Sequence, residues 1–354
     1  MDILEVISNE IKRLICGMKT FPYRFTILSV FLVLLWIIGC RIYDDRENAV
    51  MEKIKSVQGI MTEYLVHTGL ILPDQPTGMS LLGMEWSPIT TTLGDMKSKR
   101  TSTDPRWGAV MLRLFKKAGI KQGSKVAIAA SGSFPGFVLS TLLAAKTMKC
   151  DIILLPSLGA SSWGANRVKM NLADMITFLN ERFILDIRPK FITPGGGGDI
   201  GDGIPVDGIE SMKESASRAG VTFVMEKSFD RILERKWAAI EKFKPDIFVS
   251  IGGGCASLGT SPEILNVPGG LLDHKWRGKA GNGLIALALG DNIPTISLLH
   301  VRGLCQTEGI PFNPPFFSEV LPQKMPLPLC LLGILAFVMV IFSFSPWEKK
   351  ASNA

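Results

Sequence analysis

The chain has 354 residues with a net charge of +7, and 47% of its residues are hydrophobic. The excess of positive charge is small and no nucleic-acid-binding motif is present, which argues against nucleic acid as a partner. None of the six cysteines has the spacing of a metal site, so we expect no bound metal and no cofactor. Cys150, Cys255 and Cys305 lie in the central region and allow one disulfide at most. The apolar fraction is high for a soluble enzyme and points to segments that cross a membrane.

The amino-terminal region is expected to anchor the chain. Residues 1–22 carry apolar residues at helical spacing and are interpreted as an amphipathic cytoplasmic segment. A transmembrane helix is predicted over residues 23–43, where the uncharged run from Phe25 to Cys40 is flanked by Tyr and Arg residues that suit a membrane interface. Two alternatives stay open: a cleaved signal peptide, and a lipobox over residues 37–40 that would place an acyl chain on Cys40.

A second transmembrane helix is predicted over residues 327–345, an apolar run without charge, followed by a tail over residues 346–354. Two spans place both termini on the same side of the membrane. Lys and Arg residues near the spans are slightly more numerous on the terminal side. The positive-inside rule therefore favours cytoplasmic termini and an extracytoplasmic domain between the spans.

Residues 44–104 are interpreted as a juxtamembrane helix followed by an ordered loop rich in Thr, Ser, Gly and Pro. Residues 105–320 then alternate between strand and helix patterns. Strands are predicted at 125–130, 151–156, 221–225, 246–251 and 293–299, and helices at 46–69, 107–118, 137–148, 172–181, 209–219 and 231–243. This alternation is typical of an α/β fold, here a Rossmann-like, mostly parallel sheet with helices on both faces.

Four loops rich in glycine and small residues fall near the carboxyl ends of predicted strands, over residues 131–136, 157–166, 195–201 and 252–259. Ligands bind at this edge of a parallel sheet, and exposed backbone N–H groups there can hold a carboxylate or a phosphate. We therefore expect the loops to bind a ligand. The residues expected to contact it are Gly132, Ser133, Gly159, Ser161, Ser162, Trp163, Asn166, Gly196, Gly197, Gly198, Asp199, Gly252, Gly253, Gly254 and Ser257.

Whether the chain is an enzyme is left open by the sequence. The candidates for catalysis are Ser131, Ser133, Asp199 and His300. Ser133 could instead cap the following helix, and His300 could be a rim residue without a role. Asp199 stands in a run of glycines, where a carboxylate has little to pack against and could act as a base, a cap or a cation ligand. Trp163 is either a stacking platform or a core residue, and Cys255 either a nucleophile or a small packed side chain. The loops match neither the G-x-S-x-G pattern nor a P-loop.

Taken together, the loop sequences carry a resemblance to a known family. SGSFPG, SLGASSWGAN, GGGGDIG and IGGGCASLG, preceded by TTLGDMKSKRTSTDP at 91–105, resemble the bacterial poly-γ-glutamate system protein family over roughly residues 85–315. The resemblance implies a membrane component of capsule production at the bacterial cell surface, in the cytoplasmic membrane. It assigns no catalytic residue.

Poly-γ-glutamate carries one carboxylate per residue, which backbone N–H donors and a mildly basic domain can receive. The expected function is therefore a component of poly-γ-glutamate biosynthesis or export that binds the polymer or partner subunits through its glycine-rich loops. Two alternatives remain. One is a hydrolase or transferase that acts on γ-glutamyl amide bonds, and the other is a domain that binds a nucleotide or a phosphosugar.

Overall fold

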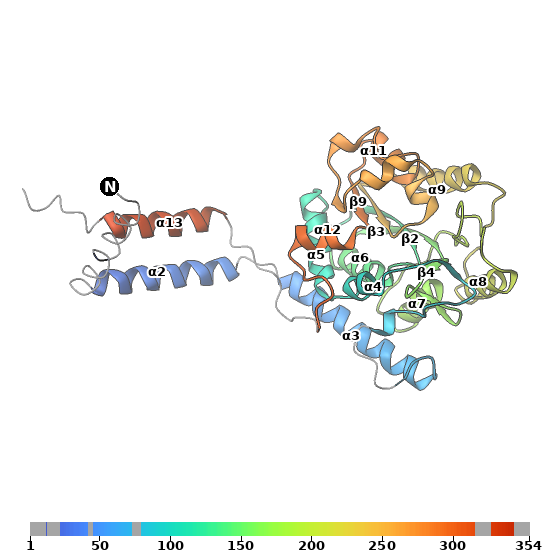
Figure 1. The fold of residues 1–354 in the computed structure, drawn as a ribbon, viewed down its shortest axis with the longest axis horizontal. Coiled ribbons are helices and arrows are strands. Elements are labelled where there is room, and N and C mark those ends of the chain that lie inside the picture. Colours follow the sequence, from blue (N-terminus) through green and yellow to red (C-terminus); the bar gives the residue numbers. More distant parts are fainter. Residues whose placement is uncertain (1–11, 13–21, 42–44, 73–78, 316–326, 343–354) are drawn as a thin grey trace, which may run out of the picture. The chain divides into compact units, whose positions relative to one another are not determined.

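The structure is a computed structural model that describes residues 12, 22–41, 45–72, 79–315 and 327–342 (Figure 1). The chain divides into two compact units, one of residues Arg46–Leu321 and the other of Met1–Asp45 together with Pro322–Ala354. Most of the predicted amphipathic segment 1–22, and the whole tail 346–354, lie outside the described residues.

The larger unit is built on a five-stranded sheet with the order β3–β2–β7–β9–β8. All neighbours pair in parallel except β8, which is antiparallel to β9. The strands are β2 (Lys125–Ser131), β3 (Asp151–Ser157), β7 (Ile247–Ile251), β8 (Gly270–Leu271) and β9 (Thr295–Leu298). The chain runs from β2 to β3 on one side and later continues with β7 on the other. The sheet therefore has a topological switch point at β2, the place where ligands bind in such folds.

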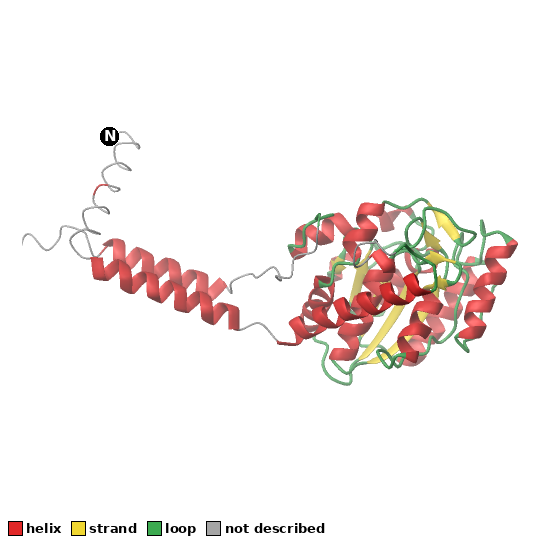
Figure 2. Ribbon diagram, turned by 90° about the horizontal axis from the view of Figure 1, so that it is seen from below, coloured by secondary structure: helices red, strands yellow, loops and turns green. Residues whose placement is uncertain are grey.

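Alternate residues of β2 pack into two separate cores, one on each face of the sheet. Val126 and Ile128 belong to the core that includes α5 (Arg106–Lys117) and α6 (Pro135–Thr147). Ala127 and Ala129 belong to the core that includes α9 (Phe229–Phe243) and α11 (Leu284–Gly290). Successive side chains of a strand point to opposite faces, so both faces are covered, and Figure 2 shows helices on either side of the strands. The prediction of an α/β fold with a mostly parallel sheet is confirmed.

The other helices of this unit are α3 (Asp45–His67), α4 (Met96–Ser102), α7 (Leu172–Glu181), α8 (Val206–Arg218), α10 (Cys255–Leu258) and α12 (Val301–Glu308). Short 3-10 turns span Met79–Leu81, Pro262–Asn266 and His274–Trp276. The remaining short strands are β1 (Thr90–Thr92), β4 (Ala160–Ser161), β5 (Asn166–Arg167) and β6 (Met170–Asn171). Among these, β1 pairs in parallel with β4 and aligns Thr92 with Ser161. That pairing joins the segment before the α/β region to the carboxyl edge of the sheet.

Two predicted elements differ from the structure. The strand expected at 221–225 is only an isolated bridge between Phe223 and Ile192. Its partner segment runs directly into the loop at Gly195 and Gly196, where positive φ angles end any ladder. The stretch 74–104, expected to be a loop, contains β1 and helix α4. Helix α4 forms because the Asp95 carboxylate accepts hydrogen bonds from the first N–H groups of the helix.

Cys150, Cys255 and Cys305 are free, so the possible disulfide within the domain does not form.

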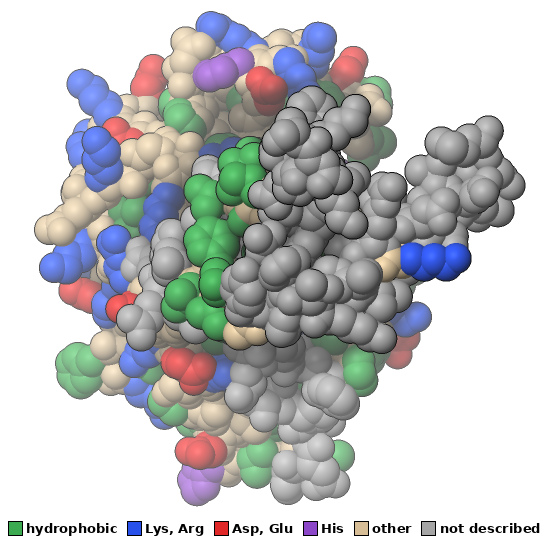
Figure 3. Space-filling view, turned by 90° about the vertical axis from the view of Figure 1, so that its left-hand side faces the viewer, with side chains coloured by type: hydrophobic (Ala, Val, Ile, Leu, Met, Phe, Trp, Pro, Cys, Tyr) green, Lys and Arg blue, Asp and Glu red, His purple; other side chains and the backbone are tan. Residues whose placement is uncertain are grey.

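The second unit contains two apolar helices, α2 (Pro22–Arg41) and α13 (Leu327–Phe342), which pack on each other. A Cβ on Gly333 of α13 would lie 3.3 Å from Leu32 of α2, so the helices touch where one has no side chain. No described helix combines the length and the apolar character needed to cross a membrane. Figure 3 shows a group of apolar side chains at the surface. Among the side chains of the pair that the structure describes, eight apolar ones are more than half exposed: Ile27, Val30, Val33, Leu34, Leu331, Ile334, Leu335 and Met339.

Candidate functional site

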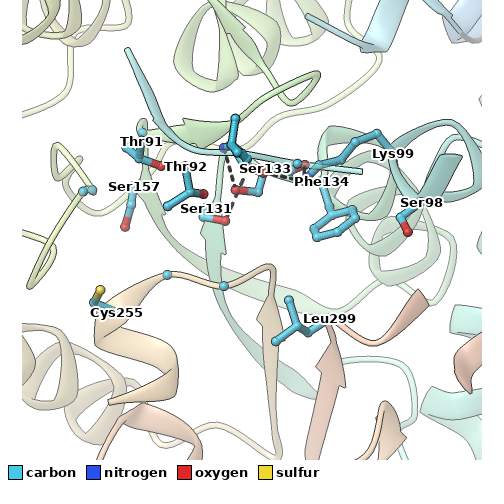
Figure 4. A pocket seen from close by; sticks show the side chains of 18 of the residues that line it. Thr91, Thr92, Ser98, Lys99, Ser131, Ser133, Phe134, Ser157, Cys255 and Leu299 are labelled. Carbon is cyan, nitrogen blue, oxygen red and sulfur yellow. Dashed lines mark hydrogen bonds between the residues drawn. The ribbon is translucent and has the colours of Figure 1, made fainter. Parts of the chain in front are cut away.

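A pocket of about 420 Å³ lies at the carboxyl edge of the sheet (Figure 4). Four neighbouring strands contribute the residues at or just after their ends: Ser131 from β2, Ser157 from β3, Gly253 after β7 and Leu299 after β9. The pocket therefore opens at the switch point of the sheet, and its volume is in the range of small-molecule sites. It is lined by Thr91, Thr92, Leu93, Gly94, Asp95, Ser98, Lys99, Ser131, Ser133, Phe134, Ser157, Gly159, Ser161, Gly195, Gly196, Gly197, Gly253, Gly254, Cys255 and Leu299.

All four glycine-rich loops contribute to this lining, together with the segment from β1 to α4. The loops approach one another through bare backbone. A Cβ on Gly195 would lie 3.0 Å from the Gly159 nitrogen, and a Cβ on Gly159 would lie 2.9 Å from the Pro194 oxygen. A side chain at either position would push the loops apart. Glycine at these points is therefore required by close contact between loops, which also brings their N–H groups to one place.

Several backbone N–H groups of the lining have no protein acceptor. Within the part of the chain that the structure describes, the N–H groups of Gly196, Gly253 and Gly254 make no hydrogen bond. Gly254 has φ −60° and ψ 132°. Its carbonyl accepts hydrogen bonds from N–H groups of α10, whereas its own N–H donates to no acceptor in the described structure. Groups of this kind are normally satisfied by solvent or by a ligand. Since the three glycines line the pocket, their N–H groups are candidate donors to an anionic group bound there.

The main charged side chain of the pocket is Lys99, which was not among the predicted site residues. It projects from α4 and is 2% exposed. Its Nζ donates to the Ser133 carbonyl oxygen and to Ser161 Oγ, both at 2.6 Å, and lies 3.6 Å from the centre of the Phe134 ring. Figure 4 shows Lys99 beside Ser133 and Phe134, across the pocket from Leu299.

Lys99 is buried without a counter-ion. No described carboxylate forms an ion pair with it. Burial away from water lowers the pKa of Lys99 to about 7, although the negative charge of Asp95 acts in the opposite direction. Asp95 itself also lines the pocket. A hydrogen bond from the Ser98 hydroxyl lowers the pKa of the Asp95 carboxyl, which also caps α4. Near neutral pH a large share of Lys99 is therefore an uncharged amine.

Three serine residues are linked to Lys99 by a chain of hydrogen bonds. Ser161 Oγ contacts Lys99, and the Ser161 N–H donates to Ser133 Oγ at 3.0 Å. The Ser133 N–H lies 3.4 Å from Ser131 Oγ. A Cβ on Gly252 would lie 2.3 Å from the same oxygen, so Gly252 leaves room for Ser131 without lining the pocket. Of the predicted catalytic serines, the structure brings both into the pocket. The serine in contact with Lys99, however, is Ser161.

Asp199 does not line the pocket, contrary to its predicted role there. Its carboxylate is buried, forms an ion pair with Lys236 of α9, and lies 3.0 Å from Thr193 Oγ1. Lys236 also donates to Ser157 Oγ at 2.9 Å. The pair thus fixes the glycine loop to the back of the pocket wall, and its charges are already balanced. Lys236 was missed because it lies on a helix with many exposed charged residues.

His300 is exposed at the start of α12 and is not among the lining residues. Trp163 also lies outside the pocket, with φ +64° and its N–H bonded to the Met84 oxygen. Asn166 is fully buried, and its amide bonds Met84 and Thr90, so it ties the segment before β1 to the sheet. The other predicted ligand-binding residues that the pocket does not reach are Gly132, Ser162, Gly198, Gly252 and Ser257.

Comparisons with known protein families, with curated proteins and with solved structures find no match for this chain. Over the residues that the structure describes, no group of three or more His, Cys, Asp or Glu side chains is placed to hold a metal ion.

Proposed function

We propose that the chain binds an anionic polymer with closely spaced carboxylates, poly-γ-glutamate, in the pocket at the carboxyl edge of the sheet, as a membrane-anchored component of its synthesis or export. The observation that carries the proposal is the set of unused N–H groups of Gly196, Gly253 and Gly254 in a pocket that also contains Lys99. Backbone N–H groups and an amine are suitable partners for a carboxylate, because hydrogen bonds to ionised groups are roughly twice as strong as neutral ones.

The polymer fits this chemistry better than an apolar ligand. Most of the residues in the lining are glycines or bear a hydroxyl group, and its large apolar side chains are Leu93, Phe134 and Leu299. Asp95 is the carboxylate of the lining, and it is held by Ser98 and by the N–H groups of α4. A ligand carboxylate therefore meets donors rather than free acceptors. The resemblance to the poly-γ-glutamate system family names the polymer, and the pocket supplies a compatible set of groups.

The sharpest test uses Gly254, whose conformation is compatible with proline. A proline ring fixes φ near −65°, close to the −60° of Gly254, and the nearest atom to a Cβ there is 3.7 Å away. Gly254→Pro therefore removes the N–H donor with little change of backbone. Gly254→Ala adds the Cβ and keeps the donor. If the N–H binds a carboxylate, Gly254→Pro loses about 1.5–3 kcal/mol of binding free energy, and Gly254→Ala binds like the native protein.

Binding is measured by calorimetry on the full-length protein in nanodiscs, with a γ-glutamate oligomer of defined length as the probe. The α-linked oligomer of equal length reports whether the γ linkage is recognised, and inorganic phosphate and a nucleotide serve as competitors. Equal affinity of the Gly254→Pro and Gly254→Ala variants for the γ-linked oligomer would contradict the proposal. Binding of the nucleotide without binding of the oligomer would support the phosphate-ligand alternative instead.

We also propose that α2 and α13 anchor the domain in the bacterial cytoplasmic membrane, with the domain outside and both termini inside. Apolar side chains of both helices are exposed, as for helices in lipid, and a glycine stands at the contact between them. The predicted spans extend beyond these helices, to residues 43 and 345. Alkaline carbonate extraction should leave the protein in the membrane fraction, and a reporter fused at residue 354 should be active only in the cytoplasm. Release by carbonate would contradict the anchor.

A further inference from the structure

The contact between Lys99 and Ser161 has a chemical consequence that polymer binding does not need. Ser161 Oγ lies 2.6 Å from Lys99 Nζ at the wall of the pocket. A serine hydroxyl becomes a nucleophile when a neighbouring base takes its proton. An amine next to a serine is one of the known forms of this arrangement, in place of histidine.

We propose that Ser161 is the nucleophile and Lys99 the general base of an enzyme that cleaves or transfers γ-glutamyl amide bonds. The inference rests on the proposed function, because the polymer bound in the pocket supplies the amide. It replaces the predicted catalytic set, of which Asp199 and His300 do not reach the pocket.

Lys99 meets the requirements for a base. It must be uncharged to accept a proton, and it lies in a buried position where no described carboxylate neutralises an ammonium group. The pKa of Lys99 is lowered to about 7 by this burial, in agreement with the geometry. A neutral amine can donate to the Ser133 oxygen and at the same time accept from Ser161. Once protonated, it is stabilised by the same carbonyl and by the face of Phe134.

Hydrogen bonds of its backbone hold Ser161 in place. The Ser161 N–H donates to Ser133 Oγ, and β4 is fixed by its pairing with β1. The hydroxyl is therefore presented to Lys99 from a backbone that is held by hydrogen bonds. Neither of the other candidate serines has a basic group within hydrogen-bond distance in the described structure: Ser133 Oγ is an acceptor for Ser161, and Ser131 Oγ for the Ser133 N–H. Ser157 Oγ does contact an amine, that of Lys236, but this amine is in an ion pair with Asp199. This leaves Ser161.

The reaction balances without any other reagent than water or an amine. Ser161 Oγ gives its proton to Lys99 Nζ and bonds to the γ-carbonyl carbon of a glutamyl residue. The carbon–nitrogen bond then breaks, and Lys99 passes the proton to the leaving nitrogen. A γ-glutamyl ester on Ser161 and a free amine result. Lys99 next takes a proton from water or from an acceptor amine, which attacks the ester. Ser161 Oγ leaves with the proton, and the product is a γ-carboxylate or a new γ-amide.

The test measures release of aminocoumarin from a γ-glutamyl oligomer that ends in a γ-linked aminocoumarin amide, with the full-length protein in nanodiscs. The native protein is expected to release the fluorophore and to show a mass increase of one γ-glutamyl chain on Ser161. Ser161→Ala and Lys99→Met are expected to lower the rate by about 10³-fold or more, as for the loss of a nucleophile or its base. Ser161→Ala should still bind the oligomer.

Two matched controls lie outside the pocket lining. Lys97→Met removes an exposed lysine from the same helix as Lys99, and Ser211→Ala removes a serine hydroxyl from α8. Both should keep the native rate. The native rate at saturating probe should rise as the pH increases through the pKa of Lys99, since only the neutral amine accepts a proton. Binding of the oligomer without release by the native protein would overturn the inference and leave the proposed function standing. Release by Ser161→Ala at the native rate would also overturn it. Absence of binding would overturn both.

Discussion

Two buried lysines of this domain lead to opposite expectations, although each is 2% exposed and each contacts a serine hydroxyl of the pocket wall. Lys236 is paired with the buried carboxylate of Asp199, whereas Lys99 has the ring of Phe134 and a carbonyl oxygen but no ion pair with a carboxylate of the described residues. A buried charge is tolerated when it is paired, and an unpaired group gives up its proton instead. The difference in partners, not in burial, makes Lys236 a structural residue and Lys99 a candidate base.

The largest effect on stability is expected from breaking the ion pair between Lys236 and Asp199. Lys236→Met leaves the Asp199 carboxylate buried without a counter-charge, so we expect a loss of about 3–5 kcal/mol in the free energy of unfolding. Urea unfolding of the full-length protein at pH 7, followed by tryptophan fluorescence, measures it. The double change Lys236→Met with Asp199→Leu removes both charges and should recover most of the loss. A single variant as stable as the native protein would mean that the ion pair does not hold the loop.

Lys99→Met should behave differently in the same unfolding experiment. It removes an amine whose burial is unfavourable, at the cost of two hydrogen bonds that contribute about 1 kcal/mol each. We therefore expect a change of stability of at most about 1–2 kcal/mol, since these contributions oppose each other. A loss as large as that of Lys236→Met would show that Lys99 is held as a charged structural residue, and the contrast between the two lysines would disappear.

A smaller effect is expected from removing the charge of Asp95, which acts on the pKa of Lys99. The charge of Asp95 raises the pKa of Lys99 and so opposes the effect of burial. Asp95→Ala should therefore move the titration of Lys99 to lower pH, and it should also remove the cap of α4, which is worth about 1 kcal/mol. Asp95→Asn keeps a capping oxygen and removes the charge, so it should shift the titration with less loss of stability. A shift to higher pH in Asp95→Asn would be inconsistent with this electrostatic arrangement.

The fold was largely predictable from the sequence, because alternating apolar strands and amphipathic helices leave few arrangements for an α/β domain. The convergence of the glycine loops followed from the same pattern, since the carboxyl ends of parallel strands share one edge. The sequence of residues 221–225 does not reveal that this stretch forms an isolated bridge instead of a strand. The reason lies in its partner: Ile192 belongs to a short segment that ends at a glycine loop.

The chemistry of the site was less accessible from the sequence. Asp199 was expected to act in the pocket because it stands in a run of glycines. Its ion pair could not be predicted, because the partner Lys236 lies 37 residues further along the chain, on a helix that presents mostly exposed charges. Lys99 was overlooked because lysine is normally a surface residue, and its burial results from the packing of α4 against α6 and α12. The capping residue Asp95 is a local signal that could have indicated α4, but no local signal indicates that Lys99 is buried.

The protonation of Lys99 is tested most directly by the rate at which an amine-selective reagent modifies it as a function of pH, followed residue by residue by mass spectrometry in the native protein. We predict half-maximal reactivity of Lys99 near pH 7, far below the ordinary lysine pKa of 10.5, and no modification of Lys236 while the domain is folded. Reactivity of Lys99 that rises only near the ordinary lysine pKa of 10.5 would contradict the central claim, because a lysine that stays charged at neutral pH cannot take the proton of Ser161.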